Sequence, residues 1–125
     1  MIYGVGVDIV EIKKIKSAVR KWGNGFLNKV FTAGEMEYCN SRRFPYMHLA
    51  SRFAAKEAIV KAFGMGFWRN GVNWTDFEIV KLKDGGAVVK LAKNIKKQFK
   101  KKEVLVSMSH CSSYAVAQAV IYKKN

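Results

Sequence analysis

The sequence predicts a single α+β domain in which a mostly antiparallel sheet packs on a long central helix. Three observations predict this fold class. Apolar residues alternate with polar residues or glycine near both ends of the chain, as they do in strands. Between those ends, apolar side chains recur with helical spacing, and a glycine-rich turn separates two further short strands. No long linker or low-complexity segment interrupts the 125 residues, so residues 1–125 are expected to form one domain.

The first strand is predicted over residues 3–10, where apolar side chains occupy every second position. Asp8 then lies on the face opposite the valines. Gly4 and Gly6 share the face of Asp8, and we expect them to leave open space beside its carboxylate. A helix with a basic surface follows, and its apolar residues recur at helical spacing: Ile12, Ile15, Val19 and Trp22.

Local signals delimit the first two predicted helices. Gly23 and Gly25 are expected to stop the first of them, because glycine is common just past a helix C-terminus. Thr32 and Glu35 have the spacing of a capping box, in which a threonine hydroxyl and a glutamate side chain each satisfy a backbone N–H of the first turn. A short helix is therefore predicted from residue 33 to about residue 40.

The central helix is predicted over roughly residues 46–63. Pro45 introduces it, and Gly64 and Gly66 follow it. A hairpin, a lysine-rich helix and a second pair of strands complete the chain, which gives the order β-α-α-α-ββ-α-ββ. These last four strands are predicted over residues 77–82, 87–91, 104–109 and 114–122.

The central helix carries the main chemical signal. Phe53, Glu57 and Lys61 stand at i, i+4 and i+8 and so share one side of the helix, where Phe53 is expected to belong to the core. A carboxylate can hold a hard cation, and an amine one turn away can meet an anionic leaving group. Asp8 supplies a second carboxylate from a separate rigid element. Magnesium is typically held by one or two carboxylates, with substrate phosphates and water completing the octahedron, so the pattern predicts a magnesium–phosphate site.

Each of these residues also has an ordinary structural interpretation. Glu57 and Lys61 could form a simple i,i+4 helix pair worth about 0.2–0.5 kcal/mol, and that interpretation is favoured when the pair is judged alone. His110 could simply end a strand. Arg52 could anchor the central helix to a protein partner or merely solvate the start of the helix. Asp8 is different, because its apolar and glycine neighbours favour a paired or metal-bound carboxylate.

The charge balance limits the classes of partner. Lysine and arginine number 23 against 9 acidic residues, which gives a net charge of +14 and attracts polyanions. The rival function from a different class is a small basic nucleic-acid-binding domain. No helix-turn-helix, zinc-finger or aromatic-glycine sheet signature supports that rival. The feature that discriminates between the two functions is the pair Asp8 and Glu57, because a nucleic-acid-binding domain has no reason to bring two carboxylates together.

The sequence also bears on cellular location. No apolar run approaches the roughly 20 residues of a membrane span, and we see no signal peptide. Cys39 and Cys111 have no metal-binding spacing and are expected to be reduced thiols. We therefore expect a cytoplasmic protein that uses neither a membrane nor nucleic acid as its partner.

Five segments together resemble a known family, the holo-acyl-carrier-protein synthases, which are the small bacterial 4′-phosphopantetheinyl transferases. The combination of Arg-Phe-Ala-Ala-Lys-Glu-Ala with an N-terminal Gly-x-Asp-Ile is highly specific, and the resemblance covers nearly the whole chain. The segments are residues 6–12, Phe31-Thr32 with Glu35, residues 52–58, residues 61–64 and residues 106–110.

The resemblance implies an activity and a set of partners. Members of this family move the 4′-phosphopantetheine arm of coenzyme A onto a serine of apo acyl carrier protein, for fatty acid biosynthesis, and release adenosine 3′,5′-bisphosphate. The reaction depends on magnesium, with manganese as the alternative ion. Family members are homotrimers with active sites between subunits. The implied partners of this chain are therefore coenzyme A, an acidic acyl carrier protein and two further copies of itself.

The resemblance also implies roles for individual residues. Asp8 and Glu57 match the magnesium ligands, and Glu57 and Lys61 are the candidate catalytic residues. Lys61, near the phosphates, and His110 match residues that contact coenzyme A. Lys14 falls where the family has a basic residue that meets the carrier protein. Arg20 is added from the basic cluster on the first helix and Arg52 from its position on the central helix, so the candidate docking residues are Lys14, Arg20 and Arg52.

One segment departs from the family pattern. The hairpin turn usually reads Asn-Asp-x-x-Gly-Lys/Arg-Pro, whereas residues 83–88 here read Lys-Asp-Gly-Gly-Ala-Val. The asparagine, the basic residue after the glycine and the proline are all missing. The departure puts in question how the adenosine end of coenzyme A is held.

Overall fold

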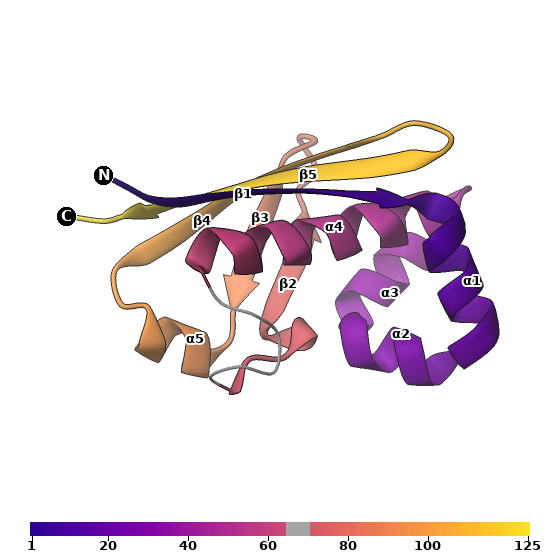
Figure 1. Ribbon diagram of the computed structural model, residues 1–125, viewed down its shortest axis with the longest axis horizontal. Helices are drawn as coiled ribbons and strands as arrows, with labels where there is room; N and C mark the ends of the chain where they lie inside the picture. Colours follow the sequence, from indigo (N-terminus) through magenta and orange to yellow (C-terminus); the bar gives the residue numbers. More distant parts are fainter. Residues whose placement is uncertain (65–70) are drawn as a thin grey trace.

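The computed structural model describes residues 1–64 and 71–125, so Gly66 lies outside the described residues. Figure 1 shows the arrangement of its helices and strands. In chain order these are β1 (Ile2–Glu11), α1 (Ile12–Trp22), α2 (Asn24–Val30), α3 (Ala33–Asn40), α4 (Pro45–Phe63), the 3₁₀ turn η2 (Trp74–Asp76), β2 (Phe77–Lys81), β3 (Ala87–Leu91), α5 (Lys93–Gln98), β4 (Lys102–His110) and β5 (Tyr114–Lys123).

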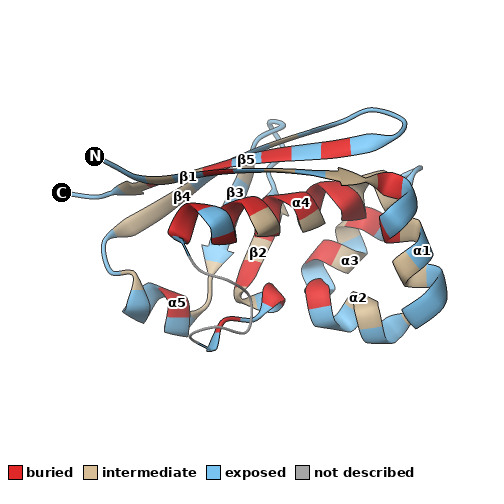
Figure 2. Ribbon diagram, in the orientation of Figure 1, coloured by how far each residue is buried: buried red, intermediate tan, exposed pale blue. Residues whose placement is uncertain are grey.

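The α+β class is confirmed, and all strand pairings are antiparallel within the described residues. Strands β1, β5 and β4 form a three-stranded sheet in the order β1-β5-β4, and α4 runs along one face of it (Figure 1). Hairpin β2–β3 forms a separate two-stranded sheet rather than part of a single one. Burial alternates along β5, because every second side chain faces α4 (Figure 2).

Helix α4 lies unusually close to β1 because two glycines remove the side chains between them. A Cβ added at Gly4 would stand 1.9 Å from the carbonyl oxygen of Ala62, and one added at Gly6 would stand 2.0 Å from that of Ala58. The expectation that these glycines leave open space beside Asp8 is therefore wrong. The backbone of α4 fills that space, and this close approach brings residues of α4 next to Asp8.

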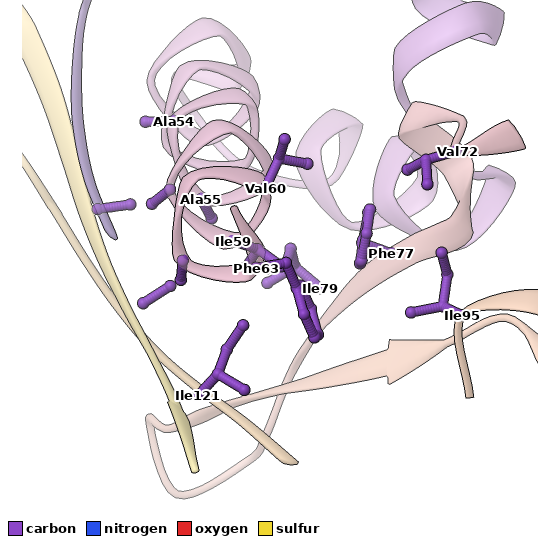
Figure 3. Close-up of a cluster of buried hydrophobic side chains, with 14 residues drawn as sticks. Ala54, Ala55, Ile59, Val60, Phe63, Val72, Phe77, Ile79, Ile95 and Ile121 are labelled. Carbon is purple, nitrogen blue, oxygen red and sulfur yellow. The ribbon is translucent and has the colours of Figure 1, made fainter. Parts of the chain in front are cut away.

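The main core lies between α4, the large sheet and the β2–β3 hairpin. Figure 3 shows Ile59 and Phe63 of α4 facing Ile79 of β2 and Ile121 of β5. A second buried cluster joins α1, α2 and α3 to the N-terminal half of α4. Helix α4 is thus buried along most of its length (Figure 2), which makes it a rigid support for the side chains that reach its exposed edge.

The element order differs from the prediction by one helix. Residues 24–30 form α2, so four helices precede the hairpin, and Gly25 lies inside a helix instead of ending one. The capping box at Thr32 is confirmed, with both of its hydrogen bonds formed. Gly64 is confirmed as the residue that ends α4, in the left-handed conformation with φ 76°. Helix α5 stops at Gln98, and β4 takes up residues from Lys102 onward.

A buried ion pair ties α2, α3, η2 and β2 to α4. Lys56 and Glu35 are both fully buried, and Lys56 Nζ donates to Glu35 Oε1 at 2.7 Å. The other two protons of this ammonium reach the carbonyl oxygens of Val30 at 2.7 Å and Trp74 at 3.1 Å. Glu35 Oε2 accepts from the backbone N–H of Ile79 at 2.9 Å. All three donors of the lysine are therefore satisfied, as a buried charge requires.

The outer face of the large sheet carries an exposed apolar patch. Val5, Val7 and Ile9 of β1 are 58%, 59% and 65% exposed, and Leu105 of β4 is 59% exposed beside them. The register places Val120 of β5 between Val5 and Leu105, so the patch is continuous across the three strands. Within residues 1–64 and 71–125, no helix is both long and apolar enough to cross a bilayer.

Candidate functional site

The close packing of α4 on β1 brings Asp8 and Lys61 together. Lys61 Nζ donates to Asp8 Oδ1 at 3.1 Å and to the carbonyl oxygen of Val7 at 3.1 Å. The side chain of Asp8 is 18% exposed and that of Lys61 is 54% exposed, so the pair lies at the edge of the core with one side open to solvent. Lys61 is therefore held beside the strand by its head group while remaining accessible to an incoming ligand.

Glu57 stands one turn before Lys61 on α4 and is half-buried. Burial raises the pKa of its carboxyl above the ordinary value, and the negative charge of Asp8 raises it further, while Lys61 acts in the opposite direction. The influence of Asp8 shows that the two carboxylates lie within electrostatic reach of each other. Two mutually repelling and partly desolvated carboxylates gain stability from a cation bound between them.

The donor set of this site suits magnesium. Among the described residues, no group of three or more histidine, cysteine or acidic side chains gathers to hold a metal alone. Asp8 and Glu57 would therefore supply two oxygen ligands and leave the remaining positions to phosphate and water. This is the usual way in which proteins hold magnesium, whereas a dedicated cage would need more protein ligands.

His110 ends β4 and is exposed. Its ring meets the ring of His48 on α4 edge to face, with 5.4 Å between ring centroids. The sequence pattern gave no reason to select His48, because a lone histidine near the start of a helix has no motif around it. Only the fold brings residue 48 to residue 110.

The expected docking residues fall into two groups. Lys14 and Arg20 are exposed on α1, as a docking surface requires. Arg52 is only 2% exposed, and its guanidinium packs over the ring of Tyr38 at 4.4 Å. Such burial does not fit a direct contact between Arg52 and a carrier protein, and the solvated helix start considered above does not fit either. Arg52 instead belongs to the interior behind His48.

The altered hairpin turn is stabilised by its own aspartate. Asp84 Oδ1 accepts from the backbone N–H of Gly86 at 3.1 Å, and Lys81 Nζ donates to the carbonyl oxygen of Gly85. Gly85 has φ 98°, a conformation that favours glycine. The charge of Lys81, at the end of β2 next to this turn, also lowers the pKa of His48.

Comparison with known proteins agrees with this architecture. Residues 4–119 match the family model described as the 4′-phosphopantetheinyl transferase superfamily. A holo-[acyl-carrier-protein] synthase of Protochlamydia amoebophila is 46% identical over 120 residues, covering 96% of this chain and 98% of the relative.

Two solved structures extend the comparison. The holo-[acyl-carrier-protein] synthase from Neisseria meningitidis has a TM-score of 0.90 at 32% identity, covering 98% of this chain and 100% of that chain. The Helicobacter pylori enzyme of the same name, in complex with coenzyme A, has a TM-score of 0.85 at 27% identity, covering 94% and 99%. The chain therefore belongs to the 4′-phosphopantetheinyl transferase superfamily, within its family of enzymes called holo-[acyl-carrier-protein] synthases.

Proposed function

We propose that this enzyme transfers 4′-phosphopantetheine from coenzyme A to a serine of apo acyl carrier protein and releases adenosine 3′,5′-bisphosphate. The reaction would be magnesium-dependent, with manganese as an alternative, and would serve fatty acid biosynthesis in the cytoplasm. The observation that carries the proposal is the meeting of Asp8, Glu57 and Lys61 where α4 packs on β1. The names of the relatives and the coenzyme A bound to the Helicobacter pylori structure support the same substrates.

The residues at this site have separable tasks. A bound magnesium ion would neutralise charge on the two phosphates of coenzyme A and align them for in-line attack. Asp8 and Glu57 would hold that ion. Lys61 would leave Asp8 for the departing phosphate oxygen, where its positive charge offsets the charge that develops. Glu57 lies one turn before Lys61 on the same side of α4, so it is also placed to orient the attacking hydroxyl or a water beside it.

A direct test is mass spectrometry of an apo carrier protein after incubation with this enzyme, coenzyme A and magnesium. The proposal expects a mass increase equal to one phosphopantetheine group, confined to the serine-bearing peptide. An unmodified carrier protein would contradict the proposed reaction. Replacing magnesium by a chelator should leave the carrier protein unmodified, which provides the control.

The exposed apolar patch on the large sheet supports an interface between copies of this chain, and the family resemblance supplies the number three. Val5, Val7, Ile9 and Leu105 form a continuous exposed patch, and patches of this kind commonly mark interfaces between chains. We propose that three copies pack through this face and that each active site lies between two of them. Sedimentation equilibrium should then give three times the 14.2 kDa chain mass, and a monomeric mass would contradict the proposal.

Replacing Lys61 by alanine is expected to lower kcat and kcat/KM by similar factors, each about 10²–10³. A charge that acts on the leaving group stabilises the transition state more than the bound substrate, so KM should change little. Steady-state kinetics with coenzyme A as the varied substrate checks this prediction. If KM rises while kcat stays constant, Lys61 is a binding residue only.

The KM for the carrier protein is expected to rise steeply with ionic strength, more than the KM for coenzyme A. The basic residues of α1 would attract an acidic protein, and exposed charges are screened over about 8 Å at physiological salt. Reversing Lys14 and Arg20 to glutamate should reproduce the effect at low salt while leaving coenzyme A affinity intact.

A matched control reverses two lysines elsewhere. Lys97 and Lys100 are exposed near α5, at the opposite end of the molecule from α1 (Figure 1). Their reversal changes net charge by the same amount, so a KM effect confined to the α1 variant assigns docking to that helix. Equal effects of the two reversals would mean that only net charge matters. No effect from the α1 variant would move docking elsewhere, with the exposed Arg42 and Arg43 as the next surface to test.

A further inference from the structure

A second group of chemically active side chains surrounds Tyr38 of α3. The guanidinium of Arg52 lies 4.4 Å from the centroid of the Tyr38 ring, and that of Arg42 lies 5.6 Å from it. The ring of His48 packs edge to face on two other rings. The ring centroids are 5.8 Å apart for Tyr38 and 5.4 Å apart for His110. One tyrosine therefore organises two arginines and the histidine pair.

The buried arginine of this group is incompletely satisfied. Arg52 Nη1 donates to the carbonyl oxygen of His48 at 3.3 Å, but its Nε and Nη2 atoms are buried and find no hydrogen-bond partner in the part of the chain that the structure describes. A buried donor without a partner costs free energy, and natural proteins keep few of them. The permanent charge of Arg52 thus lies behind His48, and no carboxylate of residues 1–64 or 71–125 forms an ion pair with it.

The charges that act on His48 are all positive. Burial lowers the pKa of its imidazole, and four basic side chains lower that pKa further. They are Arg52 of α4, His110 of β4, Arg42 of the segment after α3, and Lys81 of β2. The ring of Tyr38 on α3 faces His48 edge to face. Burial and these charges all favour the neutral imidazole in the free protein, whereas a dianion placed here would favour the protonated imidazole.

We propose that His48 takes up a proton when the ribose phosphate of coenzyme A binds beside His110, so that affinity for coenzyme A rises as the pH falls. The inference rests on the proposed function, since it takes coenzyme A as the ligand. A phosphate monoester carries nearly two negative charges at neutral pH, more than any other single group of coenzyme A. His48 would act as a positioning and proton-linked residue, while Arg42, Arg52 and Lys81 supply positive charge around it.

The sign of the effect follows from linkage. His48 has a lowered pKa in the free protein, and a neighbouring dianion raises it, so binding is coupled to proton uptake and weakens as the pH rises. A rise of one pKa unit on binding corresponds to at most a factor of ten in affinity, so the contribution of His48 to the affinity change between pH 6 and pH 8 is expected to be severalfold and no more than about tenfold. The phosphate titrates over part of this range as well, and a variant without the imidazole separates the two contributions.

The first experiment uses the wild-type enzyme, which has only two histidines. NMR titration of both imidazoles, with and without coenzyme A, should show a rise in the pKa of His48 on binding. The same titration with dephospho-coenzyme A, which lacks the ribose phosphate, should show a much smaller rise. An unchanged His48 titration in the presence of bound coenzyme A would overturn the inference.

The second experiment compares the wild type with His48→Phe, which keeps an aromatic ring against His110 but cannot take up a proton. Calorimetry in two buffers of different ionisation enthalpy counts the protons bound with coenzyme A. Wild type should take up a larger fraction of a proton than His48→Phe, and the difference should vanish with dephospho-coenzyme A. Equal proton uptake by both proteins would overturn the inference. If coenzyme A binds neither protein, both the proposed function and the role of His48 are wrong. If coenzyme A binds and its phosphopantetheine is transferred without this difference in proton uptake, only the role of His48 is wrong.

Discussion

Asp8→Asn and Glu57→Gln are each expected to lower kcat by about 10²–10³ or more while leaving the protein folded. Each change removes one of the two charged ligands proposed for magnesium but keeps the shape of the side chain. The unfolding free energy should not fall in Glu57→Gln, because burial and Asp8 already disfavour the charged form of Glu57. Loss of activity without loss of stability distinguishes a metal ligand from a carboxylate that merely supports the fold.

Three measurements complete this test. Transfer assays over a range of magnesium concentrations should show that high magnesium partly restores the variants, since a weakened site fills at higher ion concentration. NMR of the Glu57 carboxyl should show its pKa falling towards the ordinary value in Asp8→Asn, because the repelling charge is gone. Glu37→Gln, an exposed position on α3, is the control and should keep full activity. Near-normal rates in either ligand variant would contradict the shared metal site.

Sequence periodicity was sufficient to place the carboxylates and the lysine on their elements. The i,i+4 spacing fixes Glu57 and Lys61 on one side of α4, and the alternation of β1 fixes the face of Asp8. The meeting of Asp8 and Glu57 distinguishes a transferase from a basic nucleic-acid binder. The structure brings these two carboxylates within electrostatic reach of each other and places Lys61 beside Asp8. The predicted role of the β1 glycines was wrong, however. Gly4 and Gly6 make room for the backbone of α4 and not for a ligand.

The missed elements have physical causes of their own. Asn24 and Gly25 are poor helix formers, so local propensity argues against α2, and packing of Val30 into the second cluster overrides that preference. The sequence could not predict that the strands form two separate sheets, because the pattern of apolar residues within a strand does not show which other strand it pairs with. His48 gave no signal because its neighbours, Tyr38 and His110, come from distant parts of the chain.

Glu35 shows how a correct local prediction can miss a larger role. The capping box explains one carboxylate oxygen, which accepts from the backbone N–H of Thr32 at 2.9 Å. It does not reveal that the same carboxylate also holds Lys56 and Ile79. The only sequence signal for the partner is that Lys56 stands among alanines on a helix buried on most sides.

Lys56→Met is expected to lower the unfolding free energy by about 3–5 kcal/mol, a large share of the roughly 5–15 kcal/mol typical of a native domain. Methionine fills a similar volume but leaves the Glu35 carboxylate buried without its counter-charge, and it removes the donor to the carbonyl oxygens of Val30 and Trp74. Urea denaturation followed by circular dichroism measures the change. Lys97→Met, on the exposed face of α5, is the control and should stay within about 0.5 kcal/mol of the wild type.

The double variant Glu35→Gln/Lys56→Met separates the buried charge from the lost hydrogen bonds. Glutamine keeps an acceptor for the backbone N–H of Thr32 or Ile79 but carries no charge, so the double variant should be less destabilised than the sum of the two single variants. Additive effects would mean that the two side chains stabilise the fold independently. A Lys56→Met variant within about 1 kcal/mol of the wild type would contradict the buried pair itself, because a carboxylate deprived of its only buried ammonium partner in the described residues cannot remain ionised there without cost.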